Sequence, residues 1–496
     1  MSDFVFNNRT ETIPGVYATT KVVNQAGAIP PSFNIALIIG KGERGQPYDY
    51  TTVTPLKLHD KQNEVDEYYE DGSDLSVGFE YFKKHGGLKT YLLNSSNSTK
   101  GTGNLISAAA VIELTAANWG DYSAGIRIDV ANETTYVIIT ITDPDDTGVK
   151  VVSGQLSTLD LCVAWINANA SQYFAAVKSA GAVLLPGDFA GLFSTTASYV
   201  AGTSPDAIEA DWTAILAALP TWIELYDIRL ICPMIDLVTA TQHSVIQSFR
   251  DLAISQRTAG HPVQIICGGI VGDYVVDAGD TTDPAYRAGI YNNQDVILAA
   301  PGIDALAAYI TAAPAVTGLL NGSAIAHNLT RDDIVASTLE DSYTTAELET
   351  LIDAGVIAIA TNKNGFYLAK GVNTLQANDN TWNVAGKTTY LPMQRSLVDY
   401  VLKYFKEDLE SFVGADGIKK NTIASRCAYN WDVLKNSFDP SLFGENPDDV
   451  FGNGLPYKTD KIEASSDGQG WYVYLALIPA NETNFIGLTV QVLISY

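Results

Sequence analysis

Apolar and polar residues follow two different periods along this chain. Continuous apolar runs occur in "FNIALIIG", "IRLICPMI", "PVQIICGGI" and "DVILAAPGI". Stretches of helical period separate them, as in "SVGFEYFKKHGG" and "SPDAIEADWTAILAAL". Strands that are apolar on both faces and alternate with helices are typical of a largely parallel sheet that helices cover on both sides. We therefore predict an α/β core.

The stretch from about residue 105 to about residue 200 has a different pattern. "AGIRIDVAN" and "TYVIITIT" alternate as strands do, and "DPDDTG" between "TYVIITIT" and "VKVVSG" predicts a hairpin turn. "LSTLDLCVAWINANAS" is the one clear helical pattern in this part. The polar stretch "SSNSTKGTGN" (95–104) before it predicts a linker. These patterns indicate a separate β-rich domain inserted into the core.

Helices and a hairpin follow the core strands. "TTAELETLIDAGV" predicts a helix capped by Thr345, with Glu349 nearby, that ends before Gly355. "IAIATNKNGFYLAKGV" predicts a hairpin that turns at 363–365. A long helix over 395–412 carries one apolar stripe. The stripe consists of Leu397, Val398, Val401, Leu402, Phe405 and Leu409.

The last residues of the chain alternate with period two, which predicts a strand with one buried face. The apolar row is Ile486, Leu488, Val490, Val492, Ile494 and Tyr496. Terminal residues fray unless a sheet holds them, so this strand needs a partner. The partner is either "GWYVYLALIPA" of the same domain or a strand of another chain. Both pairings are compatible, because a strand has two edges.

A chain of 496 residues exceeds the size of one hydrophobic core. We predict an α/β and α+β multidomain protein with extended arms at both ends. The predicted parts are an N-terminal arm (1–20), the first part of the α/β core (21–100), the β-rich inserted domain (101–204), the rest of the core (205–376) and a C-terminal α+β domain (377–496).

The charge of the chain excludes some partners. The sequence has 56 acidic and 30 basic residues, and its formal net charge is −26. Such a protein repels phosphate backbones and anionic membrane surfaces, so we expect neither nucleic acid nor membrane insertion. The longest apolar stretch, "VILAAPGIDALAAYITAAPAVTGLL", is interrupted by two prolines and an aspartate. A protein partner of this chain is expected to be basic or nearly uncharged at the contact.

The sequence predicts no catalytic, cofactor-binding or metal-binding residues. Four cysteines lie far apart and predict buried free thiols, and no two of the five histidines are spaced as metal ligands. A subtilisin-type triad would need the order Asp, His, Ser, whereas the candidates here are His85, Ser204 and Asp277. Ser204 precedes a helix and is better explained as its N-cap.

Several stretches, in order, resemble the contractile tail sheath proteins of bacteriophages and related particles. They are "PGVY" (14–17), "IALIIGKGERGQPYDYTTVT", "WGDYSAGIRIDV" (119–130), "YDIRLICPM", "GGIVGD", "NNQDVILAAPGI", "AAPAVTGLLNGSAI" and "LETLIDAGVIAIATNKNGFYLAKGVNTL". Together they cover nearly the whole chain. The α/β core is similar to a subtilisin-type sheet without its triad.

The resemblance implies a non-enzymatic structural subunit without cofactors. It implies assembly of the chain with itself as hexameric, helically stacked rings around a tail tube protein, with baseplate and tail terminator proteins at the ends. It also implies that an N-terminal arm and the C-terminal strand enter neighbouring subunits by β-augmentation. The arm residues are Pro14, Gly15, Val16 and Tyr17. In the C-terminal domain, Lys403 and Lys406 are candidates for contact with the tube.

Contraction of such a sheath drives the tube through a bacterial envelope and delivers the viral genome. The resemblance therefore implies a place in a virion tail that is assembled in the cytoplasm of a bacterial host. A sheath of a phage-derived bacteriocin or a secretion-type injection particle is the main alternative. A subtilisin-like hydrolase is a remote one.

Overall fold

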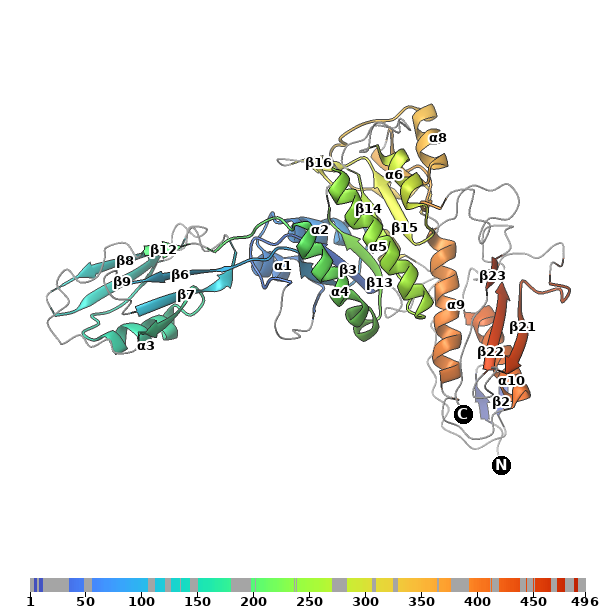
Figure 1. The fold of residues 1–496 in the computed structure, drawn as a ribbon, viewed down its shortest axis with the longest axis horizontal. Coiled ribbons are helices and arrows are strands. Elements are labelled where there is room, and N and C mark those ends of the chain that lie inside the picture. Colours follow the sequence, from blue (N-terminus) through green and yellow to red (C-terminus); the bar gives the residue numbers. More distant parts are fainter. Residues whose placement is uncertain are drawn as a thin grey trace. The chain divides into compact units, whose positions relative to one another are not determined.

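The computed structural model describes most of the chain. The described residues are 4–6, 9–11, 35–48, 56–105, 112–120, 126–133, 135–142, 150–179, 198–200, 202–235, 237, 239–269, 283–305, 309–323, 329–363, 365–375, 392–410, 412, 419–437, 443, 449, 451–464, 471–477 and 486–488. The chain forms two compact units (Figure 1). The larger unit comprises Pro30–Gly322 and Leu329–Pro392, and the smaller comprises Met1–Ile29, Ser323–Asn328 and Met393–Tyr496.

A nine-stranded sheet forms the centre of the larger unit, counted over the described residues. Its strands are β3 (Ile35–Gly40), β4 (Lys57–His59), β5 (Thr90–Asn94), β13 (Ile228–Pro233), β14 (Gln264–Gly268), β15 (Val296–Ala300), β18 (Asp333–Ile334), β19 (Val356–Asn362) and β20 (Gly365–Leu368). Their order is β18-β20-β19-β15-β14-β13-β3-β5-β4. The strands from β5 to β19 are parallel, and β4, β20 and β18 pair antiparallel at the two edges. The predicted α/β core is confirmed, whereas its likeness to a subtilisin sheet stays a prediction.

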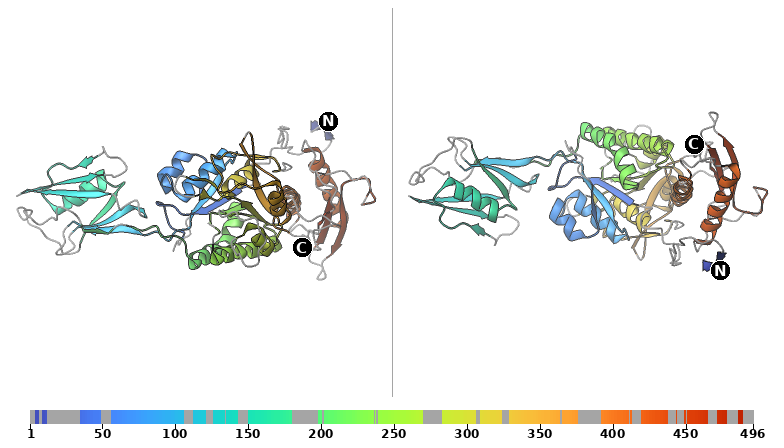
Figure 2. Two further views of the ribbon diagram at one scale, coloured as in Figure 1. Left: turned by 90° about the horizontal axis from the view of Figure 1, so that it is seen from above. Right: turned by 90° about the horizontal axis from the view of Figure 1, so that it is seen from below.

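Helices cover both faces of this sheet, as the continuous burial of β3 requires. Ala36 and Ile38 pack in a core with α1 (Gln62–Tyr69), α2 (Asp74–Lys84) and α7 (Ala313–Gly322). Leu37 and Ile39 pack on the opposite face. The helices of that face are α4 (Glu209–Tyr226), α5 (Ala240–Thr258), α6 (Pro284–Tyr291) and α8 (Thr345–Asp353). Figure 2 shows the blue helices and the green helices on opposite sides of the sheet.

The direction of winding changes once in this sheet. From β3 the chain passes to β5 on one side, returns to β13 on the other side of β3, and continues outward through β14 and β15 to β19. The carboxyl ends of β3 and β13 therefore diverge into different loops. In open α/β sheets such a switch point leaves a crevice at the carboxyl edge.

The β-rich part forms two antiparallel sheets with their own hydrophobic core. The elements are β6 (Lys100–Asn104), β7 (Ile112–Trp119), β8 (Arg127–Asn132), β9 (Val137–Thr142), β10 (Lys150–Val152), α3 (Leu159–Asn169), β11 (Phe174–Lys178) and β12 (Ser198–Val200). The predicted linker over 95–104 is wrong for its second half, because residues 100–104 form β6 between β7 and β12. Backbone pairing on both edges holds this polar, glycine-containing segment as a strand. The predicted turn "DPDDTG" lies outside the described residues, between the paired strands β9 and β10.

Backbone hydrogen bonds join the chain segments that connect this part to the core. Thr99 N donates to Thr203 O at 3.0 Å, and Gly120 N donates to Thr99 O at 2.9 Å. Gly120 has a φ of +86°, and a Cβ there would lie 2.1 Å from the carbonyl oxygen of Glu43 in the loop after β3. Only glycine fits this backbone conformation and this approach.

Two predicted helix caps are wrong by a few residues. Ser204 does not cap α4, because its Oγ donates to Glu43 O at 3.1 Å and the N-cap is Ile208. The cap of α8 is Thr344, whose backbone N donates to Glu347 Oε2 at 2.6 Å, and not Thr345 with Glu349. The predicted hairpin is confirmed, since Asn362 of β19 pairs with Gly365 of β20.

The described residues of the smaller unit form two long helices and short antiparallel sheets. Its elements are β1 (Phe4–Phe6), β2 (Arg9–Glu11), α9 (Pro392–Glu410, whose first residue belongs to the larger unit), α10 (Lys420–Ser437), β21 (Tyr457–Ala464), β22 (Trp471–Leu477) and β23 (Ile486–Leu488). The predicted apolar stripe of α9 is buried, except that Leu402 is half-buried. The ring of Phe405 lies 4.7 Å from that of Trp431 on α10, which in turn stacks on Tyr457 of β21.

Candidate functional site

The terminal sheet of the smaller unit contains the start of the predicted C-terminal strand. β22 is its central strand, paired antiparallel with β21 on one side and with β23 on the other. Leu475 pairs with Leu488 and Leu477 pairs with Ile486. The intradomain pairing with "GWYVYLALIPA" is therefore present for Ile486 and Leu488. Among the described residues no strand pairs with the other edge of β23.

The remaining residues of both predicted arms lie outside the described residues. These are Val490, Val492, Ile494 and Tyr496 at the C-terminus, and Pro14, Gly15, Val16 and Tyr17 near the N-terminus. Before the N-terminal group, β1 and β2 form a short antiparallel hairpin in which Phe4 pairs with Glu11. The role of both arms in contacts between subunits stays a prediction.

The two candidate tube-contact lysines lie on α9. The side chain of Lys403 is 14% exposed, and its Nζ lies 3.5 Å from Glu407 Oε1 one helical turn further on. Lys406 is half-buried. Asp408 on the same helix pairs with the guanidinium of Arg426 and accepts from Asn430 Nδ2 at 2.9 Å. The lysines therefore lie beside an acidic, ion-paired stretch, and a contact with the tube stays a prediction.

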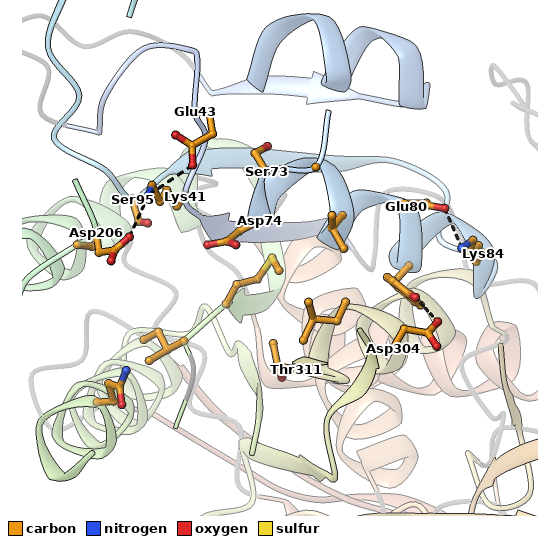
Figure 3. A pocket seen from close by; sticks show the side chains of 18 of the residues that line it. Lys41, Glu43, Ser73, Asp74, Glu80, Lys84, Ser95, Asp206, Asp304 and Thr311 are labelled. Atoms are coloured by element: carbon orange, nitrogen blue, oxygen red, sulfur yellow. Dashed lines mark hydrogen bonds and ion pairs between the residues drawn. The ribbon is translucent and has the colours of Figure 1, made fainter. Parts of the chain in front are cut away.

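The crevice at the carboxyl edge of the nine-stranded sheet is a second candidate site (Figure 3). It has a volume of about 790 Å³, within the ~300–1,000 Å³ usual for ligand pockets. One face of α2 and its N-cap line the crevice along the length of the helix, from Ser73 and Asp74 through Val77 to Tyr81. The loops after β3, β5 and β13, the β16–β17 hairpin (Ile303–Ala305 and Tyr309–Ile310) and the start of α5 provide the other walls.

Carboxylates and lysines gather at the two ends of this crevice. At one end Lys41 Nζ lies 3.1 Å from Asp206 and 3.4 Å from Glu43. Burial opposes the charge of Lys41, but these two carboxylates outweigh it and raise its pKa. Figure 3 shows these three side chains together, apart from Glu80, Lys84 and Asp304.

At the other end Lys84 Nζ lies 2.7 Å from Glu80 and 4.8 Å from the centre of the Tyr81 ring. Tyr81 donates its hydroxyl proton to Asp304, which also accepts from Thr338 N at 2.8 Å. Burial opposes the charge of Asp304, yet these hydrogen bonds and nearby Lys84 lower its pKa. Burial, then the bond to Asp304, raises the pKa of Tyr81, so the phenol stays protonated.

The sequence alone does not indicate this crevice, because the residues that line it are scattered from 41 to 338. The available signal was local: Lys41, Ser95 and Met234 each come directly after a buried parallel strand. Such positions meet at one edge of a sheet only when strand order is known. Alternation of strands and helices does not provide that order.

The triad candidates do not form a hydrolase site among the described residues. His85 Nδ1 donates to Tyr81 O at 2.7 Å, and Val335 N donates to His85 Nε2 at 2.9 Å. Both ring nitrogens are thus occupied by backbone groups, while Ser204 is bonded to the carbonyl of Glu43. Asp277 lies outside the described residues. His85 and Ser204 therefore have structural partners other than each other.

The four cysteines are buried free thiols, as predicted. Burial raises the pKa of Cys162 and of Cys232 to about 12, so neither is a reactive thiolate at neutral pH. Over the part of the chain that the structure describes, no cluster of His, Cys, Asp and Glu could hold a metal ion. In the same residues no helix is both long and apolar enough to cross a membrane.

No family model and no curated protein matches this sequence. Solved structures do match the fold. The sheath tail protein from Desulfitobacterium hafniense superposes with a TM-score of 0.65 at 16% identity, over 97% of this chain and 100% of that chain. The sheath tail protein from Listeria innocua gives 0.62 at 13% identity, over 95% and 97% of the two chains. A chain of the anti-feeding prophage baseplate gives 0.50 at 10% identity, over 97% and 99%. The chain therefore has the fold of tail sheath proteins over nearly its whole length.

Proposed function

We propose that this chain is the structural subunit of a contractile tail sheath. Copies of it polymerise as stacked hexameric rings around an inner tail tube, and their contraction drives the tube through a bacterial envelope. The observation that carries this proposal is the likeness of fold to two sheath tail proteins, which extends over 95% or more of this chain and of each of theirs. A likeness confined to the α/β core would support only a general α/β protein.

The terminal sheet supports a mechanism for polymerisation. β23 has a partner on one edge only among the described residues, and the sequence continues its alternation to Tyr496. An unpaired strand edge pairs readily with a strand from another chain, and alternate side chains set the register. We propose that the C-terminal strand and the N-terminal arm at 14–17 make these links. A repeated head-to-tail contact whose rotation does not close produces a helical tube.

The partners in this proposal are further copies of the chain, the tail tube protein, and the baseplate and tail terminator proteins. A switch between extended and contracted sheath needs two packings of one subunit that differ by a few kcal/mol, linked by arms that stay connected. No nucleotide is needed, because the free energy comes from contacts that form on contraction.

The main alternative keeps the sheath but places it in a bacteriocin or secretion-type injection particle. The fold likeness to a chain of the anti-feeding prophage baseplate favours keeping this alternative. Genes for a capsid and for DNA packaging beside the gene of this protein would favour a phage. A hydrolase stays a remote alternative, and labelling of Ser204 by a serine-reactive probe would support it.

Electron microscopy of the purified full-length protein tests the proposal. We expect open rings or helical tubes that lengthen with protein concentration, since association follows mass action. Added tail tubes should become coated. Compact monomers at every concentration, with and without tail tubes, would contradict the proposal.

A further inference from the structure

The crevice along α2 has an excess of negative charge at both ends. At the first end two carboxylates, Glu43 and Asp206, face one ammonium group, that of Lys41. At the second end Glu80 and Asp304 face the ammonium group of Lys84. Among the residues that line the crevice, each end therefore lacks one positive charge. Asp74, the first residue of α2, adds a fifth carboxylate to the lining.

The ends are a defined distance apart. Leu75 N donates to Lys41 O at 3.1 Å, so the first end lies at the first turn of α2. Tyr81, which holds Asp304, lies seven residues after Asp74 on the same helix. At 1.5 Å per residue this corresponds to about 10 Å along the helix axis.

The surface between the ends is apolar. Val77 lines the crevice between Asp74 and Tyr81, and Met234 and Ile310 line it from other elements. Met234 lies close under α2, because a Cβ on Gly78 would meet its sulfur at 2.3 Å. A glycine inside a helix costs about 0.5–1 kcal/mol relative to alanine, and here it makes room for Met234.

We propose that this crevice binds a linear oligoamine, a molecule whose ammonium groups are joined by methylene chains. The terminal ammonium groups of an extended triamine are separated by a distance similar to that between the two ends. They would supply the missing positive charge at each end, and the methylene chains would lie on Val77, Met234 and Ile310. The lysines at the two ends already show the contacts expected for such groups, since Lys84 lies on an aromatic ring and against a carboxylate.

Other ligand classes fit the crevice less well. Anions are disfavoured by five lining carboxylates against two lysines. A bare metal ion needs three converging ligands, and no such group occurs among the described residues. A second copy of the chain is a poor source of positive charge, because each copy carries a net charge of −26.

Titration calorimetry of the full-length protein with spermidine tests this proposal. In about 0.15 M salt, where exposed charges are screened beyond ~8 Å, we expect saturable binding at one site per chain. Ethylenediamine, which is too short to span the two ends, should bind more weakly. Replacing one carboxylate at either end, by Glu43→Gln or Glu80→Gln, should weaken spermidine binding about threefold to fivefold. The double variant should approach the product of the two factors.

The matched control is Glu349→Gln, which removes an exposed carboxylate of α8 outside the crevice. It should leave spermidine binding unchanged, and all variants should keep the thermal melt of the parent protein. Equal weakening by Glu349→Gln would show a diffuse attraction of cations to an acidic protein and would overturn the proposal. So would absent or unsaturable binding, or equal affinity for ethylenediamine.

Discussion

The nine-stranded sheet and the terminal sheet differ in how completely their strands are buried and paired. Every residue of β13, β14 and β15 is buried, and helices pack on both faces. In the terminal sheet only two of the eight residues of β21 and four of the seven residues of β22 are buried, and the described part of β23 has three residues. Helices cover both faces of the first sheet, whereas in the second several residues of β21 are exposed and no described strand pairs with the outer edge of β23. A subunit that must stay folded while its contacts change benefits from this division.

The difference predicts that the two sheets respond to damage separately. Substitutions that disrupt packing on the nine-stranded sheet should lower the stability of the subunit. Substitutions that disrupt the terminal strand should prevent assembly. The following variants test this separation in order of expected effect.

The largest effect is expected for Val490→Pro. Proline removes one backbone donor and fixes φ, and it is tolerated poorly within a paired strand. We expect polymerisation to be lost while the cooperative thermal melt of the monomer is retained, as measured by electron microscopy and calorimetry. Val490→Ala, which keeps the backbone donor, should still assemble. A Val490→Pro subunit that builds tubes would show that this strand is not the link.

Gly318→Ala tests whether a substitution in the larger unit lowers stability without preventing assembly. Gly318 lies on α7 where it crosses α2, and a Cβ there would lie 2.3 Å from the carbonyl oxygen of Phe82. Because the obstacle is backbone, the helices must separate, and overpacking of this kind costs about 1–3 kcal/mol. We expect a lower urea midpoint for unfolding of the larger unit, with assembly retained at low temperature.

The control for this variant is Gly154→Ala. A Cβ on Gly154 meets no atom within 4 Å, and this glycine is not in the left-handed region. Its urea midpoint should therefore equal that of the parent protein. Equal losses in Gly318→Ala and Gly154→Ala would show that the close crossing of α2 and α7 does not limit stability.

The same contrast explains what the sequence could predict. Runs such as "IRLICPMI" are apolar because both faces of β13 are covered, so the α/β core was visible from periodicity. The strand β6 was not visible, because "KGTGN" is polar and its pairing with β7 and β12 depends on backbone groups alone. The cap at Thr344 was missed by one residue because Thr345 and Glu349 offered a similar pattern next to it.

The crevice was not predictable for a related reason. Its two charged ends join residues from opposite parts of the chain, such as Tyr81 and Asp304. Their proximity follows from the order of strands around β3, which no local pattern encodes. By contrast, the alternation from Ile486 to Tyr496 is local, and its first residues do form β23.

A smaller loss of stability is expected when the pH is lowered, and it should affect the larger unit. Burial and then nearby Lys57 lower the pKa of His59 to about 4. Burial and then Arg287 lower the pKa of His243 to about 3. Both values lie below the ~6.5 of an unfolded histidine. The unfolded state therefore binds more protons, and stability falls as the pH drops from about 6.5 towards 4.

Urea midpoints measured at about pH 7 and about pH 5 check this. His59→Gln and His243→Gln should each lose less stability over that interval than the parent protein, because each removes one proton-binding group of the unfolded state. Carboxylates contribute equally to all three proteins and cancel. Identical losses in the parent and both variants would show that these histidines titrate normally in the folded chain.

The smallest effect on stability is expected on α9, where the double reversal Lys403→Glu and Lys406→Glu tests the contact with the tail tube. Glutamate at 403 faces Glu407 one turn away, and like charges at this spacing cost about 0.2–0.5 kcal/mol. The fold should survive, since the buried stripe of α9 is untouched. If these lysines face the tube, coating of tail tubes should fall several-fold while assembly without a tube continues. Lys435→Glu on the exposed face of α10 makes the same kind of charge change elsewhere and should leave coating unaltered. Normal coating by the double variant, or equal loss with Lys435→Glu, would remove α9 as the contact and leave the tube-facing surface of the smaller unit to be sought on another element.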